Sequence, residues 1–458
     1  MKELDQYRKI FTNLPAGVVE AEAEAEKRDR IVAGLTNGAE SELSAADKTA
    51  VFVRAAGVRT GTTYTQNLEA DAEEVLLEAL KNSRYVQENQ KEELNRPDAS
   101  DSKVLLHNTQ GQINRPEEGK HVAFEELLDK AAKLETEAKK LIPGISHISV
   151  ALSECLVTAG IVNSLGLDKT YSRRVAEAQL QLTVEGATHR SIALETSAGT
   201  AADISPHCFS AKLKEWGQWP TKTVRLTRTN MEAVLDAGVI CNIFFTAWQM
   251  FSGVQYHNKS TPFYNRLGET LFPAIVNISD IPWGSGFGYE REFDCEGTPC
   301  RRVDVIKEGC FRELMHNLKT ARKSGTVSTG NAGRDTNLIS DQTEVKVIPT
   351  HFTLLPGTAK KEELLGKLAD GIYICESYDM FHSVNTTSGD FAIPCQGIRY
   401  CGGKPDKMVK GITISGNLMD LFGQVEDIAD DRATSSMVMS KSLEVGASSV
   451  YVKKLAVT

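Results

Sequence analysis

The side chains with the clearest capacity for chemistry are nine histidines, and their spacing argues against a common zinc site. They are scattered from His107 to His382, none is followed by Glu, and no two lie within one or two helical turns of each other. A helical H-E-x-x-H site needs two imidazoles on one helix face and an adjacent carboxylate as the base. The sequence therefore predicts no catalytic zinc of that kind.

Nine cysteines are also present, and they include no C-x-x-C pair. An odd number of cysteines in a long chain is typical of free thiols, most of which serve as small core residues. Cys295 with Cys300, and Cys395 with Cys401, are close in sequence, but their spacings match no common zinc or disulfide arrangement. We therefore expect neither a bound metal nor a cofactor.

Composition limits the class of protein further. The 458 residues are 41% hydrophobic and 25% charged, which is ordinary for a globular chain of two or three domains. A net charge of -9 argues against a nucleic-acid or anionic-membrane partner, because clustered Lys and Arg normally meet such surfaces. The N-terminus MKELDQYRKIF lacks the apolar stretch of a signal peptide, so we expect a cytoplasmic location.

The elements that must position these groups alternate between strand and helix in the first half of the chain. Residues 50–54 read as a strand, and residues 69–83 as a helix with Leu76, Leu77 and Leu80 on its apolar face.

A second helix is predicted from Phe124 to Leu141, where apolar residues recur at three and four positions, and Pro143-Gly144 ends it. Residues 148–152 and 176–184 alternate with period two, as strands with one buried face do. The turn Asn163-Ser164-Leu165-Gly166 should connect two neighbouring strands.

These elements predict an α+β fold with three parts. Residues 1–118 form an N-terminal α/β lobe ending in a polar linker, and residues 119–222 form a middle α/β lobe. From Val224 onward, short apolar runs are separated by Gly, Asn and Asp, so residues 223–458 are predicted to form a mainly antiparallel, barrel-like β domain.

Short motifs in this second half resemble, in order and spacing, the signatures of the TldD/PmbA family, also called the modulator of DNA gyrase family. They are FDCEGTP at 293–299, KEG at 307–309, ARK at 321–323, STGNA at 328–332, LPG at 355–357, HSVNTTSGDF at 382–391 and GITISGNL at 411–418. The turn at residues 163–166 is similar to the family's N-S-x-G turn. The resemblance therefore spans nearly the whole chain.

The resemblance also separates two lineages by their chemistry. TldD-like members carry H-E-x-x-x-H on an early helix of this domain and a cysteine near the C-terminus, and they are zinc peptidases. Here the corresponding stretch from Cys241 to Phe251 is mainly aromatic and aliphatic, and residues 431–458 contain no cysteine. The resemblance thus implies the PmbA (TldE) lineage, which lacks the metal ligands and forms a complex with the peptidase. Residues Ile243 to Phe251 fit either a buried helix or a subunit interface.

One loop is a candidate for binding peptides. Residues Ser328 to Arg334 combine Ser, Thr, two Gly, Asn and Arg, which is too polar for a strand. Exposed N–H groups, an amide and a guanidinium can hold a peptide backbone or carboxylate. The candidate residues are Ser328, Thr329, Gly330, Asn331 and Arg334. The alternative is that these side chains, like Asp390 and Asn417, only close their own turns.

The expected function is that of a non-catalytic subunit, without catalytic residues or activity of its own. It would belong to a cytoplasmic TldD/TldE-type zinc peptidase complex, with a TldD-like catalytic partner and short or unfolded peptides as substrates. One alternative is a free-standing homodimer that binds peptides. Another is a metal-independent hydrolase with a cysteine nucleophile and His257 or His382 as its base. Neither G-x-S-x-G nor a P-loop is present in the sequence.

Overall fold

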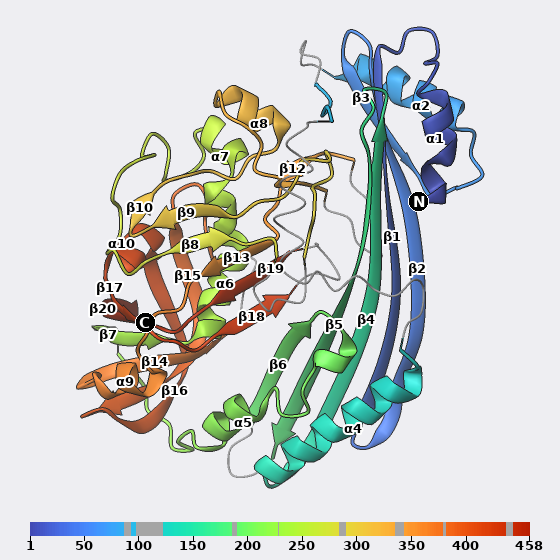
Figure 1. Cartoon of the computed structure of the whole chain (residues 1–458). Coiled ribbons are helices and arrows are strands. Elements are labelled where there is room, and N and C mark those ends of the chain that lie inside the picture. Colours follow the sequence, from blue (N-terminus) through green and yellow to red (C-terminus); the bar gives the residue numbers. More distant parts are fainter. Residues whose placement is uncertain are drawn as a thin grey trace.

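Strands with a period-two pattern build one six-stranded sheet in the N-terminal half. The computed structural model describes residues 1–86, 93–97, 122–185, 190–227, 229–283, 290–334, 343–378, 382–436 and 443–458. The sheet has the order β3-β2-β1-β4-β5-β6, and all its pairs are antiparallel. Its strands are β1 Glu20–Thr36, β2 Ala39–Ala56, β3 Thr60–Thr65, β4 Ile145–Asn163, β5 Asp168–Val184 and β6 Arg190–Ala198. Figure 1 shows the long strands β1, β2, β4 and β5 side by side along most of the molecule.

This sheet contains strands from both predicted N-terminal lobes, residues 1–118 and residues 119–222. Strand β1 pairs with β4 from Glu22 opposite Asn163 to Thr36 opposite Ser149. The turn at residues 163–166 connects β4 and β5, which pair along most of their length, as predicted. The boundaries after residues 118 and 222 stay predictions.

Helices cover the two ends of the sheet separately (Figure 1). Helix α1 Asp5–Ile10, preceded by the 3-10 turn η1 Lys2–Leu4, packs with α2 Ala72–Asn82 and η2 Ser83–Tyr85 at one end. Helix α4 Phe124–Leu141 covers the other end and has the bounds that the sequence predicts. Its buried residues Leu127, Ala131, Leu134 and Ala138 lie on one face.

The apolar face of α2 is narrower than its sequence suggests. Leu76 is fully buried and Leu80 is partly buried, but Leu77 is 40% exposed. Consecutive helical residues point about 100° apart, so Leu76 and Leu77 cannot both face the sheet squarely. Asp71 begins the helix, and its carboxylate accepts the N–H of Glu73 at 2.9 Å.

A closed barrel forms the C-terminal half. Its strands follow the order β16-β15-β14-β7-β20, and β16 also pairs with β20, which closes the ring. Strand β17 extends the sheet beyond β20, and β14 with β7 is the parallel pair. The bounds are β7 Thr229–Leu235, β14 Asp370–Ser377, β15 Asp390–Cys401, β16 Lys404–Asn417, β17 Val425–Ile428 and β20 Val450–Val457. The predicted α+β fold with a mainly antiparallel, barrel-like domain is confirmed.

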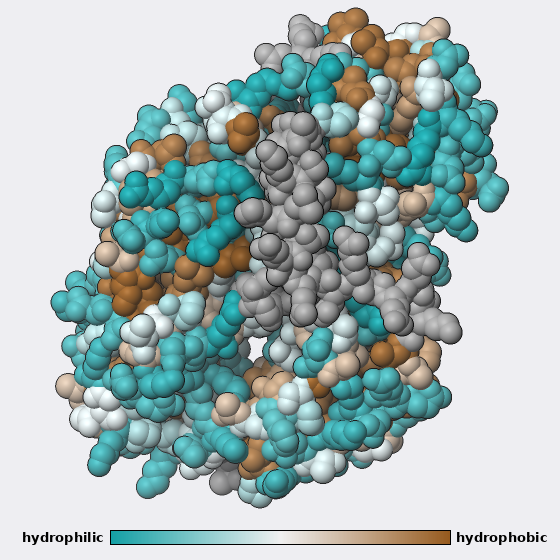
Figure 2. Space-filling model, in the orientation of Figure 1, coloured by the Kyte–Doolittle hydropathy of each residue, from teal (hydrophilic) through white to brown (hydrophobic). Residues whose placement is uncertain are grey.

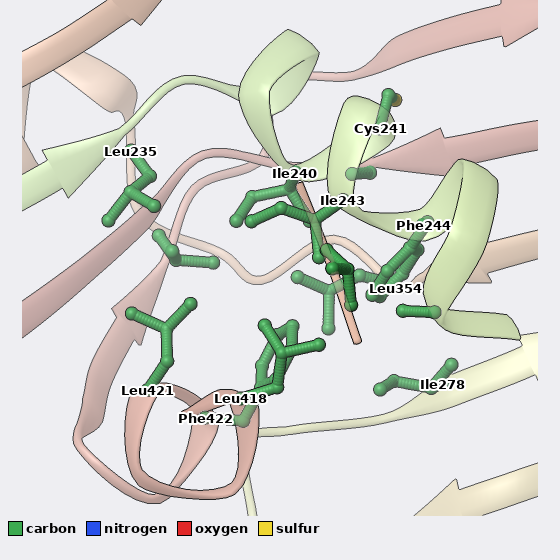
Figure 3. Close-up of a cluster of buried hydrophobic side chains, with 14 of the residues drawn as sticks. Leu235, Ile240, Cys241, Ile243, Phe244, Ile278, Leu354, Leu418, Leu421 and Phe422 are labelled. Atoms are coloured by element: carbon green, nitrogen blue, oxygen red, sulfur yellow. The ribbon is translucent and has the colours of Figure 1, made fainter. Parts of the chain in front are cut away.

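A second six-stranded sheet lies beside the barrel, in the order β10-β9-β8-β13-β19-β18. Its strands are β8 Ile278–Asp280, β9 Val303–Lys307, β10 Cys310–Phe311, β13 His351–Leu354, β18 Ala433–Ser436 and β19 Glu444–Ala447. Helix α6 Ala237–Ala247 contacts both β14 of the barrel and β19 of this sheet. In Figure 3, Ile240, Ile243 and Phe244 point from α6 toward α10 Leu418–Gly423. The stretch from Ile243 to Phe251 therefore contributes to the core of this domain.

Shorter elements complete the chain. They are η3 Ala201–Asp203, α5 Ser210–Gly217, η4 Trp248–Phe251, α7 Gly253–His257, α8 Leu318–Lys323, α9 Lys361–Gly366 and the two-stranded pair β11 Ala332–Gly333 with β12 Lys346–Val347. Among the described residues, no helix combines the length and apolar character that crossing a membrane requires.

The two neighbouring leucines of α2 provide a test of this packing. Leu76→Ala should lower the free energy of unfolding by about 2–5 kcal/mol, because it leaves a cavity between α2 and the sheet. Leu77→Ala removes the same atoms from a half-solvated site and should cost less than about 1 kcal/mol. Denaturant unfolding of the two variants measures the difference. Equal losses would contradict the buried face described for α2.

Candidate functional site

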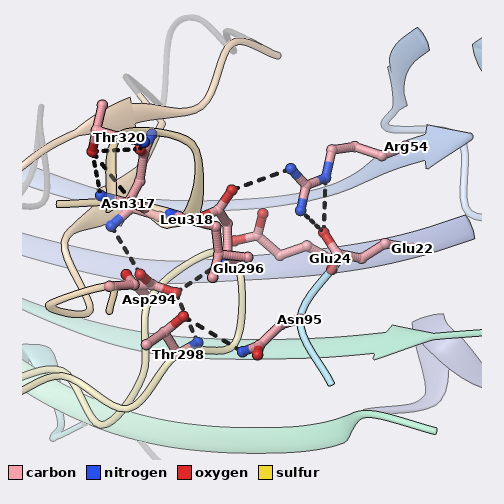
Figure 4. A network of polar contacts seen from close by, with 12 residues as sticks. Glu22, Glu24, Arg54, Asn95, Asp294, Glu296, Thr298, Asn317, Leu318 and Thr320 are labelled. Carbon is pink, nitrogen blue, oxygen red and sulfur yellow. Dashed lines mark hydrogen bonds and ion pairs between the residues drawn. The ribbon is translucent and has the colours of Figure 1, made fainter. Parts of the chain in front are cut away.

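The alternating Ala and Glu residues of β1 build a charged face on the N-terminal sheet. Successive side chains of a strand point to opposite faces. Ala21, Ala23 and Ala25 therefore pack in the core that includes α2. Glu22 and Glu24 lie on the other face, toward loops of the C-terminal domain (Figure 4). Glu22 stands opposite Arg54 of β2 in the strand register.

A buried polar contact, here called the seam, joins this face to the C-terminal domain. It consists of Glu22, Glu24, Arg54, Asp294, Glu296 and Arg334. The Arg54 guanidinium contacts Glu22 at 2.6 Å and Glu296 at 3.2 Å, and none of these three side chains is more than 4% exposed. Arg334 pairs with Glu24 and lies over the Phe52 ring, 4.8 Å from its centroid. Buried charges are tolerated only with such partners, because each loses its hydration.

The two acidic residues of the FDCEGTP motif hold neighbouring loops in place. Asp294 accepts the N–H groups of Glu296 and Thr298 through Oδ1, and that of Ala332 through Oδ2 at 2.9 Å. Glu296 Oε2 accepts the N–H of Leu318 at the start of α8, at 2.8 Å. Burial raises the pKa of Asp294 to about 6 and that of Glu296 to about 7, although arginines oppose both shifts.

The candidate peptide-binding loop, Ser328 to Arg334, is mostly buried at the seam. Thr329 and Asn331 are each 1% exposed. The Asn331 amide donates to Asp280 Oδ2 at 2.6 Å, and Thr329 accepts the N–H of His316 at 2.7 Å. At Gly330, φ is +77°, and a Cβ atom would lie 2.5 Å from Cys300 Cα. The loop therefore differs from the exposed loop that its polarity suggested, because its polar groups bind one another and neighbouring strands. Ser328 is the candidate residue that stays partly exposed.

A small cleft opens where Arg334 meets the sheet. Its volume is about 40 Å³, and Glu24, Phe52, Arg291, Asp294 and Arg334 are among its walls. That space equals about one water molecule, whereas small-molecule sites occupy about 300–1,000 Å³. Arg334 is thus the one of the five candidate residues that lines this cleft, and peptide binding by the five stays a prediction.

Only part of the seam has a signal in the sequence. The Glu-Ala alternation marks one polar face of β1, but exposure to water is the usual fate of such a face. The partners Arg54 and Glu296 lie 242 residues apart, so no local pattern links them. The buried pair His351 and Glu444, with Nδ1 and Oε2 3.3 Å apart, also had no sequence signal.

Helix α6 carries the stretch where the resemblance implies metal ligands in the TldD lineage. Cys241 points away from the Ile240 and Phe244 side of the helix (Figure 3), and its thiol donates to the carbonyl of Ala433 at 3.4 Å. Burial raises the pKa of the Cys241 thiol well above its usual value. The Asn242 amide donates to Ser377 Oγ at 2.8 Å. Zinc needs about three deprotonated ligands. No group of three or more His, Cys, Asp or Glu side chains in the described parts of the chain could hold a metal ion, so this donor set does not fit zinc.

Replacing Glu296 by Gln tests the electrostatics of the seam. A carboxyl with a raised pKa stabilises the fold fully below its unfolded pKa of 4.5, and this contribution is lost as pH rises through about 7. Between pH 5 and 8 the unaltered protein should therefore lose up to about 3 kcal/mol of stability relative to Glu296→Gln. Unfolding curves at several pH values measure this difference.

Asp168→Asn is the control for that experiment. Its hydrogen bond to Arg8 lowers the pKa of Asp168, so its contribution is already complete above pH 5. The offset between this variant and the unaltered protein should stay constant from pH 5 to 8. A constant offset for Glu296→Gln as well would show that the seam does not raise the pKa of Glu296.

Comparison with known proteins places these motifs in a family. Residues 228–458 match the model of the PmbA/TldA metallopeptidase C-terminal domain. The metalloprotease PmbA of Escherichia coli O157:H7 is 26% identical over 193 residues, which cover 42% of this chain and 39% of that protein. The PmbA homologue of Buchnera aphidicola from Acyrthosiphon pisum is 29% identical over 210 residues, covering 45% and 43%. The matched segments thus span less than half of these relatives.

Solved structures share the whole fold. A structure described as a modulator of a DNA gyrase, from Thermotoga maritima, superposes with a TM-score of 0.82 at 24% identity and covers 100% of this chain and 99% of its own. TldE from Thermococcus kodakarensis gives a TM-score of 0.81 at 17% identity with the same coverage. These likenesses establish the fold, and the family model covers half of the sequence. The chain therefore belongs to the PmbA/TldD family, as its collinear motifs indicate.

Proposed function

We propose that this chain is the non-catalytic, PmbA/TldE-like subunit of a cytoplasmic zinc peptidase complex that acts on short or unfolded peptides. The observation that carries the proposal is the chemistry of α6, where a buried thiol, a bound amide and aromatic side chains occupy the stretch in which the catalytic lineage holds its metal. A single protonated thiol, an amide and aromatic rings do not make up the three ligands that catalytic zinc needs, and they do not activate water. A TldD-like partner must then supply both.

Exposed hydrophobic side chains support contact with a partner. They gather at the end of the N-terminal sheet that carries α2, at the upper right of Figure 2. Val19 is 61% exposed, Val58 89%, Leu77 40% and Tyr85 81%. Val19 donates its N–H to Ala56, and Arg59 reaches the carbonyl of Val86, so these segments adjoin. We call these four residues the apolar end. Exposed apolar patches of this kind are typical of interaction sites.

Peptides would bind by adding a strand to a sheet edge. Strand β3 pairs with β2 from Val51 to Ala56, so the earlier part of β2 is an edge of the sheet. Main-chain hydrogen bonds at such an edge give affinity with little side-chain selectivity, which suits unfolded peptides better than folded proteins.

The cysteine-hydrolase alternative has weak support from the geometry. A nucleophilic cysteine needs a lowered pKa, whereas burial raises the pKa of Cys208 to about 11 and that of Cys395 to about 12. His257 Nε2 contacts the Thr320 carbonyl at 3.2 Å and Ser324 Oγ at 3.0 Å. The free-standing homodimer that binds peptides remains the alternative for which the experiments below are designed.

Purification without a histidine tag tests the absence of catalytic zinc. We expect well under one zinc per chain by elemental analysis and little or no peptide cleavage by the isolated chain. About one zinc per chain, or cleavage that persists with a chelator, would overturn this part of the proposal.

Co-expression with the TldD-like protein of the same organism tests the partnership. The two should elute together from gel filtration and cleave a short peptide only when zinc is present. Val58→Glu places a charge at the apolar end and should reduce co-elution, because desolvating an unpaired carboxylate is costly. Val327→Glu, at a 73% exposed position outside the apolar end, is the matched control. Separate elution together with full activity of the partner alone would favour the free-standing homodimer.

A further inference from the structure

A second cavity, much larger than the cleft of the seam, lies between the N-terminal sheet and the outside of the barrel. Its volume is about 220 Å³, and it shares no wall residue with that cleft. Its walls come from the start of β6, the end of α5 and the segment that follows it, the end of β14, and strands β15 and β16. Figure 1 shows α5 and β6 beside the barrel strands β14 and β16. The space equals about seven water molecules, which is less than a whole small-molecule site of about 300–1,000 Å³ but enough for one large side chain.

Three bulky, buried side chains contribute to the walls of this cavity, here called the aromatic pocket. Trp216 is 2% exposed, Trp219 6% and Met408 4%. Tyr378, which is 58% exposed, stands at the mouth. Large aromatic walls with two rotatable bonds each bind flat or bulky apolar groups at little entropic cost. One part of the ligand is therefore aromatic or bulky and apolar.

The Arg190 guanidinium in the pocket points to a second, anionic part of the ligand. It stacks on Trp216, 4.3 Å from the ring centroid, and donates to the Trp216 carbonyl. Within the described part of the chain, no carboxylate pairs with Arg190. An anion in the pocket would supply that partner.

The remaining charges at the pocket fit this assignment. Lys410 lies at the exposed rim, and Glu376 is the carboxylate in the lining. Gln396 Nε2 donates to Glu376 Oε2, which occupies one oxygen of that carboxylate. Two cations against one anion leave the pocket with a positive excess, which attracts a carboxylate.

We propose that the aromatic pocket binds the C-terminal residue of a peptide that ends in an aromatic or bulky apolar side chain. The side chain packs against Trp219, and the free α-carboxylate pairs with the Arg190 guanidinium. That the ligand is a peptide rests on the proposed function. The recognition of a carboxylate attached to an apolar group by these residues does not rest on it. A pocket at this position anchors one peptide end, while strand addition holds the rest without side-chain selectivity.

Calorimetric titration of the full chain with the peptide Gly-Gly-Ser-Gly-Phe tests the assignment. The free acid should bind about tenfold or more tightly than the C-terminal amide, because a charge-assisted pair is lost on amidation. The same peptide ending in Gly should bind much more weakly. Equal affinity for the acid and the amide, or no binding of any peptide, would overturn the proposal. Free phenylalanine binding as tightly as the peptide would assign the pocket to single amino acids and overturn the peptide assignment.

Variants separate recognition from folding. Arg190→Gln keeps a donor for the Trp216 carbonyl but removes the charge, so the preference for the acid should fall about tenfold. Arg399→Gln is the control, since Arg399 lies on β15 and pairs with Asp370 away from the pocket. Unchanged acid preference in a folded Arg190→Gln variant contradicts the proposal. The assay uses neither zinc nor a partner, so its failure is distinct from failure of the subunit proposal.

Discussion

The buried ion pairs of the seam are the constraint on which the arrangement of the two halves depends. If the sheet separated from the C-terminal domain, Arg54 would keep Glu22 of its own sheet as a partner, but water would replace Glu296. The same contact orders the motif loops, since Asp294 ties residues 293–299 to Ala332 and Glu296 caps α8. Removing one partner of such a network leaves the other charge buried and unpaired. The seam therefore joins the sheet to the C-terminal domain through buried charges that depend on one another.

Helix α6 packs on both of its sides. Its apolar side joins the aromatic cluster around Phe352, with ring centroids of Phe244 and Phe352 5.1 Å apart. The opposite side presents Cys241 to backbone carbonyls of β18 and β19. Both sides are thus used for stability. A metal here would require charged, deprotonated ligands in a site that disfavours charge, since burial already raises the pKa of Cys241 well above its usual value.

The sequence predicts features that depend on local periodicity and misses those that depend on distant partners. The helix from Phe124 to Leu141 and the turn at residues 163–166 follow from spacing and turn chemistry alone. The sequence predicts Leu77 on the buried face of α2, because residue type alone does not show which edge of the apolar stripe the sheet covers. The sequence predicts an exposed loop from Ser328 to Arg334 because its acceptors Asp280 and His316, which lie 51 and 13 residues from the donors, are outside any local turn pattern. The aromatic pocket likewise combines residues 190, 216–221 and 376–410.

Two sets of buried groups oppose each other in their effect on stability. Burial raises the pKa of Asp294 and Glu296, so their contribution is complete at low pH and is lost as the pH rises toward about 6 and about 7. Burial lowers the pKa of His316 and His351 to about 4, so their contribution is complete above pH 6.5 and is lost as the pH falls toward that value. Between about pH 4.5 and 6.5 the two sets act in opposite directions. The stability of the whole chain therefore varies less with pH than the contribution of either set, because a falling pH removes the contribution of the two histidines while it restores that of the two carboxyl groups.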